Sequence, residues 1–241
     1  MNENLLEELL DVWSKTYYLK PILLIFISIS FFVGVKFYTK ESSYLNFLIY
    51  IIVSLILLIL LDIDINKKGV SQRFRTIIIE SENTFLEIVE FIAFYHYFFK
   101  ILVTKNAKAL MRIVIIPFII LTIIFYVKIF DFEFSRNQII SLSYKINVIE
   151  FFLLFFPCLI FFYELFTIES KQKLTKSPSF WIITGLFFYC TISLPFLLIG
   201  DQLAVNNREL FYFMFAVHNA SLIFLFFSFT KAFLCKKHLI Q

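Results

Sequence analysis

The stretch YLNFLIYIIVSLILLILL, which covers residues 44–61, contains no charged side chain. A helix that crosses the hydrocarbon core of a bilayer needs about 20 mostly apolar residues. The rest of the chain has a similar character, since 60% of its 241 residues are hydrophobic and only 17% are charged. A water-soluble domain of this size cannot bury so much apolar surface, whereas lipid can cover it. The sequence therefore predicts an integral membrane protein.

Seven stretches in all are apolar and long enough to form transmembrane helices. We expect an all-α membrane bundle whose helices cover residues 21–38, 44–61, 84–103, 109–130, 147–168, 180–199 and 209–230. The third stretch is the least apolar, because it contains Glu87, Glu90 and His96. Residues 17–235 then form the transmembrane domain, preceded by an amphipathic segment at residues 1–16 and followed by a short cytosolic tail at residues 236–241.

Basic residues in the short loops predict the orientation, because cytosolic loops of membrane proteins carry an excess of Lys and Arg. If the loop after the first helix is cytosolic, most acids fall on the outer side, among them Asp62, Asp131 and Asp201. The basic loop after the second helix is an exception, since it also falls outside. The compact basic loops still favour an N-terminus outside and a C-terminus in the cytosol. The cytosolic basic residues are then Lys36, Lys40, Lys100, Lys105, Lys108, Arg112, Lys171, Lys173, Lys176, Lys231, Lys236 and Lys237.

Ionisable side chains inside the predicted spans are candidate functional residues, because a charge in the hydrocarbon core is costly. Glu87 and Glu90 lie three residues apart on one helix face, and Tyr97 lies seven residues beyond Glu90 on the same stripe. His218 and Asn219 lie near the middle of the last span. Each could bind a ligand or proton, or could form a hydrogen bond that holds helices together. We predict an outward cavity as the ligand-binding site, lined by Glu87, Glu90, Tyr97, Tyr189, His218 and Asn219.

The fifth predicted span carries Glu150, Pro157 and Glu164 at intervals of seven residues, so all three share one stripe. Glu150 lies near the outer end of the span and Glu164 near the inner end. We interpret both as carboxylates that reach towards the nearer membrane surface. Pro157, and Pro195 in the sixth span, are expected to kink their helices, because proline removes a backbone hydrogen bond.

Several activities lack the residues that they need. A Schiff base to retinal requires a lysine in the middle of a span, and the last predicted helix has none before Lys231. The HExxH, GxSxG and Walker patterns do not occur in the sequence. Cys158, Cys190 and Cys235 have no metal-ligand spacing and are interpreted as small buried hydrophobic residues. We therefore expect no enzyme, with no catalytic residue, cofactor, metal ion or nucleic-acid partner.

Three segments carry a pattern of membrane-embedded residues: NTFLEIVEFIAFYHYFF (83–99), SPSFWIITGLFFYC (177–190) and VHNASLIFLFFSFTKAFLC (217–235). In this pattern residues 80–235 resemble a functionally uncharacterised family of bacterial membrane proteins with seven transmembrane helices. The resemblance implies a stand-alone sensor module in the bacterial cytoplasmic (inner) membrane, in some cases paired with a separate sensory kinase. The residues that carry it are Asn83, Glu90, Phe180, Trp181, Ile182, Gly185, Tyr189 and Asn219.

Three functions are consistent with these features. The first is a membrane sensor or receptor-like module, in which a ligand, a pH change or a membrane state shifts helix packing near Pro157 and Pro195. The short cytosolic segments then pass the signal to a separate cytosolic or membrane partner. The second is a small transporter or channel subunit with Glu90 as a proton-coupled site, and the third is a structural subunit of a membrane complex. The odd number of helices and the buried polar cluster favour the sensor.

Overall fold

The computed structural model describes residues 19–37, 42–65, 72–129, 136–167 and 174–236, and these residues form helices with no strand. The predicted amphipathic segment at residues 1–16 lies outside the described residues, as do residues 237–241 of the predicted tail. The described part of the chain contains seven α-helices and one short 3-10 helix, η1 (Leu174–Lys176). The α-helices are α2 (Leu19–Phe37), α3 (Ser42–Ile65), α4 (Gln72–Ile101), α5 (Lys105–Ile129), α6 (Arg136–Thr167), α7 (Pro178–Asn206) and α8 (Arg208–Lys236).

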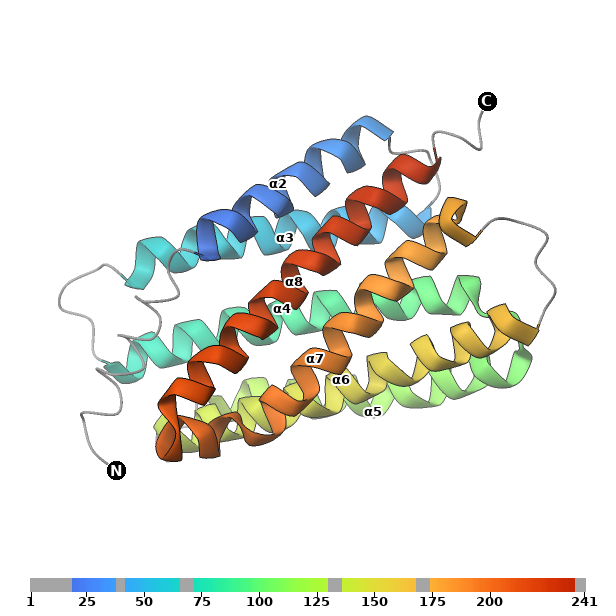
Figure 1. Cartoon of the computed structure of the whole chain (residues 1–241). Coiled ribbons are helices and arrows are strands. Elements are labelled where there is room, and N and C mark those ends of the chain that lie inside the picture. Colours follow the sequence, from blue (N-terminus) through green and yellow to red (C-terminus); the bar gives the residue numbers. More distant parts are fainter. Residues whose placement is uncertain (1–18, 38–41, 66–71, 130–135, 168–173, 237–241) are drawn as a thin grey trace.

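Consecutive helices run in opposite directions along one bundle (Figure 1), so α2 begins at one end and α8 finishes at the other. Six of the helices form a ring, in which α2, α3, α4, α6, α7 and α8 contact one another in that order and α8 packs back against α2. The remaining helix, α5, packs against α4 and α6 from outside the ring. The interior of the ring is therefore lined by six helices, while α5 keeps most of its surface exposed.

Four of these helices contain stretches long and apolar enough to cross a membrane, which supports a helical membrane protein. These stretches, in α5 to α8, are Lys105–Lys128, Ser141–Thr167, Pro178–Gly200 and Glu209–Cys235. The described parts of α2 and α3 hold shorter apolar stretches, and α4 is less apolar because it contains several glutamates. Large apolar side chains cover the outside of the bundle, as lipid contact requires. The count of seven spans and the orientation stay predictions.

Several helices extend beyond the apolar stretches from which they were predicted. α4 begins at Gln72 rather than at residue 84, and α6 begins at Arg136 rather than at residue 147. An apolar stretch marks only the part of a helix suited to lipid, whereas backbone hydrogen bonds continue into polar sequence. The helices also continue through their prolines, since Pro157 lies inside α6 and Pro195 inside α7.

A single residue, Asn207, connects α7 to α8. Its backbone N–H donates to the Leu203 carbonyl at 2.8 Å, which ends α7. Its side-chain Oδ1 accepts the backbone N–H of Leu210 at 3.1 Å, which caps the start of α8. This tight connection brings α7 and α8 side by side, and they form the most extensive helix pair in the described bundle. Asn is among the residues preferred at this capping position, so the sequence held a signal for the turn.

Candidate functional site

Glu90 lies inside the ring, where α4 faces α3. It is only 6% exposed, and its Oε2 accepts a hydrogen bond of 2.7 Å from the Tyr50 hydroxyl. Tyr50 belongs to α3 and is itself 1% exposed. A buried tyrosine hydroxyl usually needs a polar partner, so a tyrosine in the interior of the apolar stretch of residues 44–61 was a usable signal. Tyr50 was not predicted as a site residue.

Two further polar residues reach the same region from α6. The Asn147 side chain hydrogen-bonds to the Glu87 carboxyl on α4. Glu150, one turn further along α6, interacts electrostatically with both Glu90 and Glu87. It is only 1% exposed, so it lies inside the bundle and does not reach towards the membrane surface as predicted. The reason is the rotation of α6, which turns this face of the helix towards α4 and α7.

Glu87, Glu90 and Glu150 thus form a carboxyl cluster between α4 and α6. Each has one buried oxygen without a hydrogen-bond partner in the described part of the chain, namely Glu87 Oε2, Glu90 Oε1 and Glu150 Oε1. The Oδ1 of Asn147 is in the same situation. Burying a polar atom without a partner costs about 1–3 kcal/mol, so such groups usually have a further role. Chemically, the cluster offers acceptor oxygens to protons or to hydrogen-bond donors.

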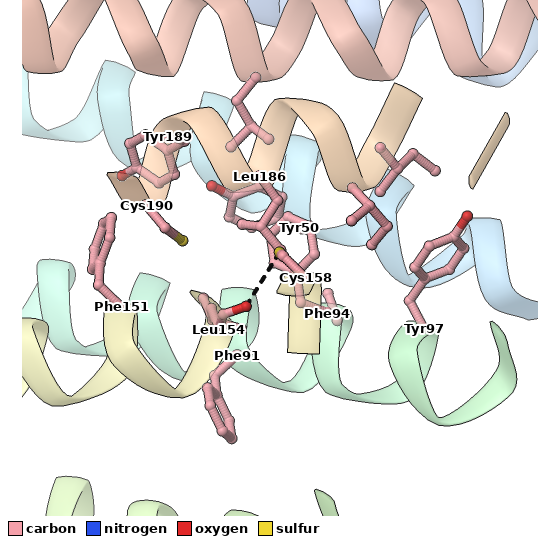
Figure 2. Packing of buried hydrophobic residues seen from close by; sticks show 14 of the residues in the cluster. Tyr50, Phe91, Phe94, Tyr97, Phe151, Leu154, Cys158, Leu186, Tyr189 and Cys190 are labelled. Atoms are coloured by element: carbon pink, nitrogen blue, oxygen red, sulfur yellow. Dashed lines mark hydrogen bonds between the residues drawn. The ribbon is translucent and has the colours of Figure 1, made fainter. Parts of the chain in front are cut away.

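Tyr189 and His218 extend this polar region towards α7 and α8. Tyr189 interacts electrostatically with Glu90, Glu150 and Glu87, and its ring packs against Phe151 at a centroid distance of 5.0 Å (Figure 2). The His218 ring lies 5.8 Å from the Tyr189 ring, and its Nδ1 is 2.8 Å from the Ser193 hydroxyl. The structure therefore brings Tyr189 to the carboxyl cluster, and His218 packs against Tyr189.

The structure gives Tyr97 and Asn219 other partners. Tyr97 donates its hydroxyl to Ser179 Oγ at 2.8 Å, which links α4 to the first turn of α7 at the other half of the bundle. Asn219 donates its side-chain N–H to the Phe215 carbonyl, a bond within α8 rather than between helices. The predicted outward cavity grouped these residues with Glu90, but their hydrogen bonds lead away from the carboxyl cluster.

Aromatic side chains fill the ring next to the carboxyl cluster, on the side towards Tyr97. Figure 2 shows Tyr50, Phe94 and Tyr97 along this part of the core. The ring centroids of Phe47 and Phe94 are 5.2 Å apart, and those of Phe94 and Phe229 are 6.0 Å apart. Because these side chains are fully buried, they separate the carboxyl cluster from the end of the bundle where α4 finishes. The buried aromatic residues of this half include Phe47, Phe94, Tyr97, Phe98, Phe226, Phe229 and Phe233.

Glu164 has a different role from the other buried carboxyls. Its Oε2 accepts the backbone N–H of Val103 at 2.8 Å, and its Oε1 accepts that of Thr104 at 2.9 Å. Val103 and Thr104 form the turn between α4 and α5, so Glu164 ties this turn to the end of α6. The prediction was a carboxylate that reaches towards the inner membrane surface. The bonds to Val103 and Thr104 were missed because one sequence does not show contacts between residues about 60 positions apart.

The comparisons add no family assignment to this geometry. No protein-family model, curated protein or solved structure matches the chain. The resemblance to a bacterial seven-helix family therefore stays a prediction. Within the described residues, no group of three His, Cys, Asp or Glu side chains is arranged to hold a metal ion. The candidate site thus consists of the carboxyl cluster with Tyr50, Asn147 and Tyr189.

Replacing Tyr50 by phenylalanine tests the bond at the centre of this site. The variant leaves Glu90 Oε2 buried without its donor, so we expect a loss of unfolding free energy of about 1–3 kcal/mol. The measurement is unfolding of the detergent-solubilised protein by heat or by SDS. The matched control is Tyr163→Phe on α6, whose side chain is 69% exposed and which should change stability little. Equal stability of the two variants would contradict this assignment.

Proposed function

We propose that the protein is a membrane-embedded sensor whose input site is the carboxyl cluster of Glu87, Glu90 and Glu150. The supporting observation is that each of these buried carboxyls has an oxygen without a partner in the described chain. A proton or a donor ligand that reaches one of them changes its charge or its hydrogen bonding in a low-dielectric interior. Such a change acts on α3, α4 and α6 together, because Tyr50 and Asn147 connect the cluster across these helices.

A sensor agrees with the distribution of polar and aromatic residues better than a transport path does. A path for ions or solute needs polar groups or water along the whole depth of the membrane. Here the carboxyl cluster lies in one half of the ring, and packed aromatic side chains fill most of the other half, where buried hydroxyls such as those of Ser30 and Ser228 donate to helix carbonyls. The alternative, a transporter or channel subunit with a proton-coupled Glu90, predicts proton or solute flux when the protein is reconstituted in liposomes.

The signal would leave the bundle at its basic end. Lys36 and Lys100 lie in the last turns of α2 and α4, and Lys176 lies in η1 before α7. These ends and the start of α5 lie at the same end of the bundle (Figure 1). By the distribution of Lys and Arg we assign this end to the cytosol. The resemblance to a bacterial seven-helix family supports a bacterial cytoplasmic membrane as the location. A separate partner, such as a sensory kinase, would contact the bundle there.

Trp181 provides a reporter at this end. Its Nε1 donates to the Thr175 carbonyl at 2.9 Å, and the Lys231 ammonium lies 5.8 Å from its ring. The chain has two tryptophans, so Trp13→Phe leaves Trp181 as the only one. In this background, with the protein in nanodiscs, we expect the Trp181 emission to change as the pH is titrated. The change should be strongly reduced by Glu90→Gln or Glu150→Gln, because neither variant can exchange a proton at that site.

Two controls separate the carboxyl cluster from other titrating groups. Glu209→Gln changes an exposed acid at the start of α8 and should leave the pH response intact. Tyr50 and Tyr189 also face the cluster, and His218 lies behind Tyr189, so His218→Gln is the second control. A response that survives both cluster variants but disappears in His218→Gln would place the input at the histidine. A response absent from the parent protein would exclude protons as the input.

A further inference from the structure

A basic patch lies where α4 turns into α5. Lys100 is in the last turn of α4, and Lys105, Lys108 and Arg112 follow on the first two turns of α5. The chain has no acidic residue between Glu90 and Asp131. No acidic residue in this segment of the sequence can therefore neutralise the patch.

Two of these cations contact the aromatic ring of Phe99. The Arg112 guanidinium lies 4.9 Å and the Lys108 ammonium 5.7 Å from the centre of its ring. Lys108 and Arg112 are one helical turn apart and share one face of α5. The electron-rich ring attracts both cations, which as like charges four residues apart on one helix face repel each other. An anion placed between them would relieve that repulsion.

Glu164 is the carboxylate that α6 brings to this region, and it also interacts electrostatically with Lys108. Both of its oxygens accept backbone N–H groups from Val103 and Thr104. Its single charge offsets only part of the charge of the neighbouring cations. Among the described residues the patch accordingly keeps a net positive charge, and the donor groups of Arg112, which is exposed, have no acceptor there.

The surface of α5 next to the patch is apolar and uncovered. Because α5 packs outside the ring, a row of large side chains beyond Arg112 faces away from the protein. Their exposure reaches 70% at Ile113, which directly follows Arg112. The row consists of Ile113, Ile116, Ile120, Ile123 and Val127. A ligand that fits both features has an anionic head and long apolar chains.

We propose that Lys108 and Arg112, held over Phe99, bind the headgroup phosphate of an anionic phospholipid whose acyl chains lie along the exposed face of α5. Arginine binds phosphate through two parallel N–H groups, and lysine adds a point charge. Basic residues at the cytosolic membrane surface attract anionic lipids by this chemistry. The positive charge of Lys108 and Arg112 favours a phosphate group. The adjoining apolar row on α5 favours a lipid over a free anion. This inference does not depend on the proposed sensor function.

The test measures lipids retained by the purified full-length protein. Native mass spectrometry is recorded after mixing with phosphatidylglycerol or phosphatidylcholine in detergent micelles. We expect preferential retention of phosphatidylglycerol, weakened about fivefold by Lys108→Gln or by Arg112→Gln. Raising the salt concentration should weaken binding to the parent protein as well. The salt experiment needs no variant and keeps the test valid if Arg112→Gln does not fold.

The matched control is Lys145→Gln, an exposed lysine on α6 near the opposite end of the bundle. It should retain phosphatidylglycerol like the parent protein, and Arg112→Lys should retain more of it than Arg112→Gln. Equal losses in Lys145→Gln and Lys108→Gln would overturn the proposal, because they would indicate general attraction to a basic protein. Equal retention of the two lipids would also overturn it. Displacement of the lipid by millimolar inorganic phosphate would show a free-anion site instead.

Discussion

Gly185→Ala is expected to lower the unfolding free energy by about 1–3 kcal/mol, because α7 and α8 are too close at this position for a side chain. A Cβ atom on Gly185 would lie 2.6 Å from the Ser228 Cβ and 2.8 Å from its Oγ. Both helices are continuous here, so neither backbone can yield locally. The direction of the change in unfolding free energy is informative, because replacing glycine by alanine inside a helix ordinarily stabilises the helix by about 1 kcal/mol. Unfolding in SDS or by heat measures the difference.

Two further variants identify the cause of this loss. Gly200→Ala also lies inside α7, but its Cβ would meet no atom closer than 3.6 Å, so this variant should be neutral or slightly more stable. Ser228→Gly removes the atoms that clash with the new methyl group, and the double variant Gly185→Ala with Ser228→Gly should recover part of the stability. The next neighbour would then be the Leu225 Cα at 3.5 Å, an ordinary contact. A Gly185→Ala variant as stable as Gly200→Ala would contradict the close approach of α7 and α8.

The sequence predicted the helical class well because apolar stretches report directly on lipid contact. It located each long helix but not its full length, since the polar beginnings of α4 and α6 continue the same backbone hydrogen bonding. The rotation of a helix about its axis was harder to predict. The six residues that follow Glu150 are all apolar, so the sequence did not indicate which face of the helix meets the protein.

The candidate site was predicted in part. Glu87 and Glu90 share a face of one helix, which follows from spacing alone, and Tyr189 reaches them from α7. Tyr50 and Asn147 were missed because their roles depend on which helices are neighbours, and packing determines that order. Tyr97 was predicted to share the helix face of Glu90. However, α4 is long enough for its two ends to contact different helices. Tyr97 consequently bonds to Ser179, in the opposite half from Glu90.

Glu164→Ala is expected to lower the unfolding free energy by about 2–3 kcal/mol, because Val103 and Thr104 lose a shared charged acceptor. A hydrogen bond to a charged group contributes about 1.5–3 kcal/mol, and two are lost here. Val103 and Thr104 are themselves exposed, so water can replace part of the bonding and keeps the loss below twice the single value. Glu164→Gln retains one acceptor oxygen and should lose about half as much. SDS or thermal unfolding measures both.

Hydrogen exchange distinguishes this role from a general loss of stability. In Glu164→Ala the amides of the turn between α4 and α5 should exchange faster, while those of the aromatic core around Phe94 stay protected. Thr167→Ala is the matched control, because within the described residues the Thr167 hydroxyl bonds only to carbonyls of its own helix, those of Tyr163 and Glu164. It should change stability by less than about 0.5 kcal/mol and leave the turn protected. Equal exchange at the turn in Glu164→Ala and Thr167→Ala would mean that packing, and not the carboxylate, holds α6 to the start of α5.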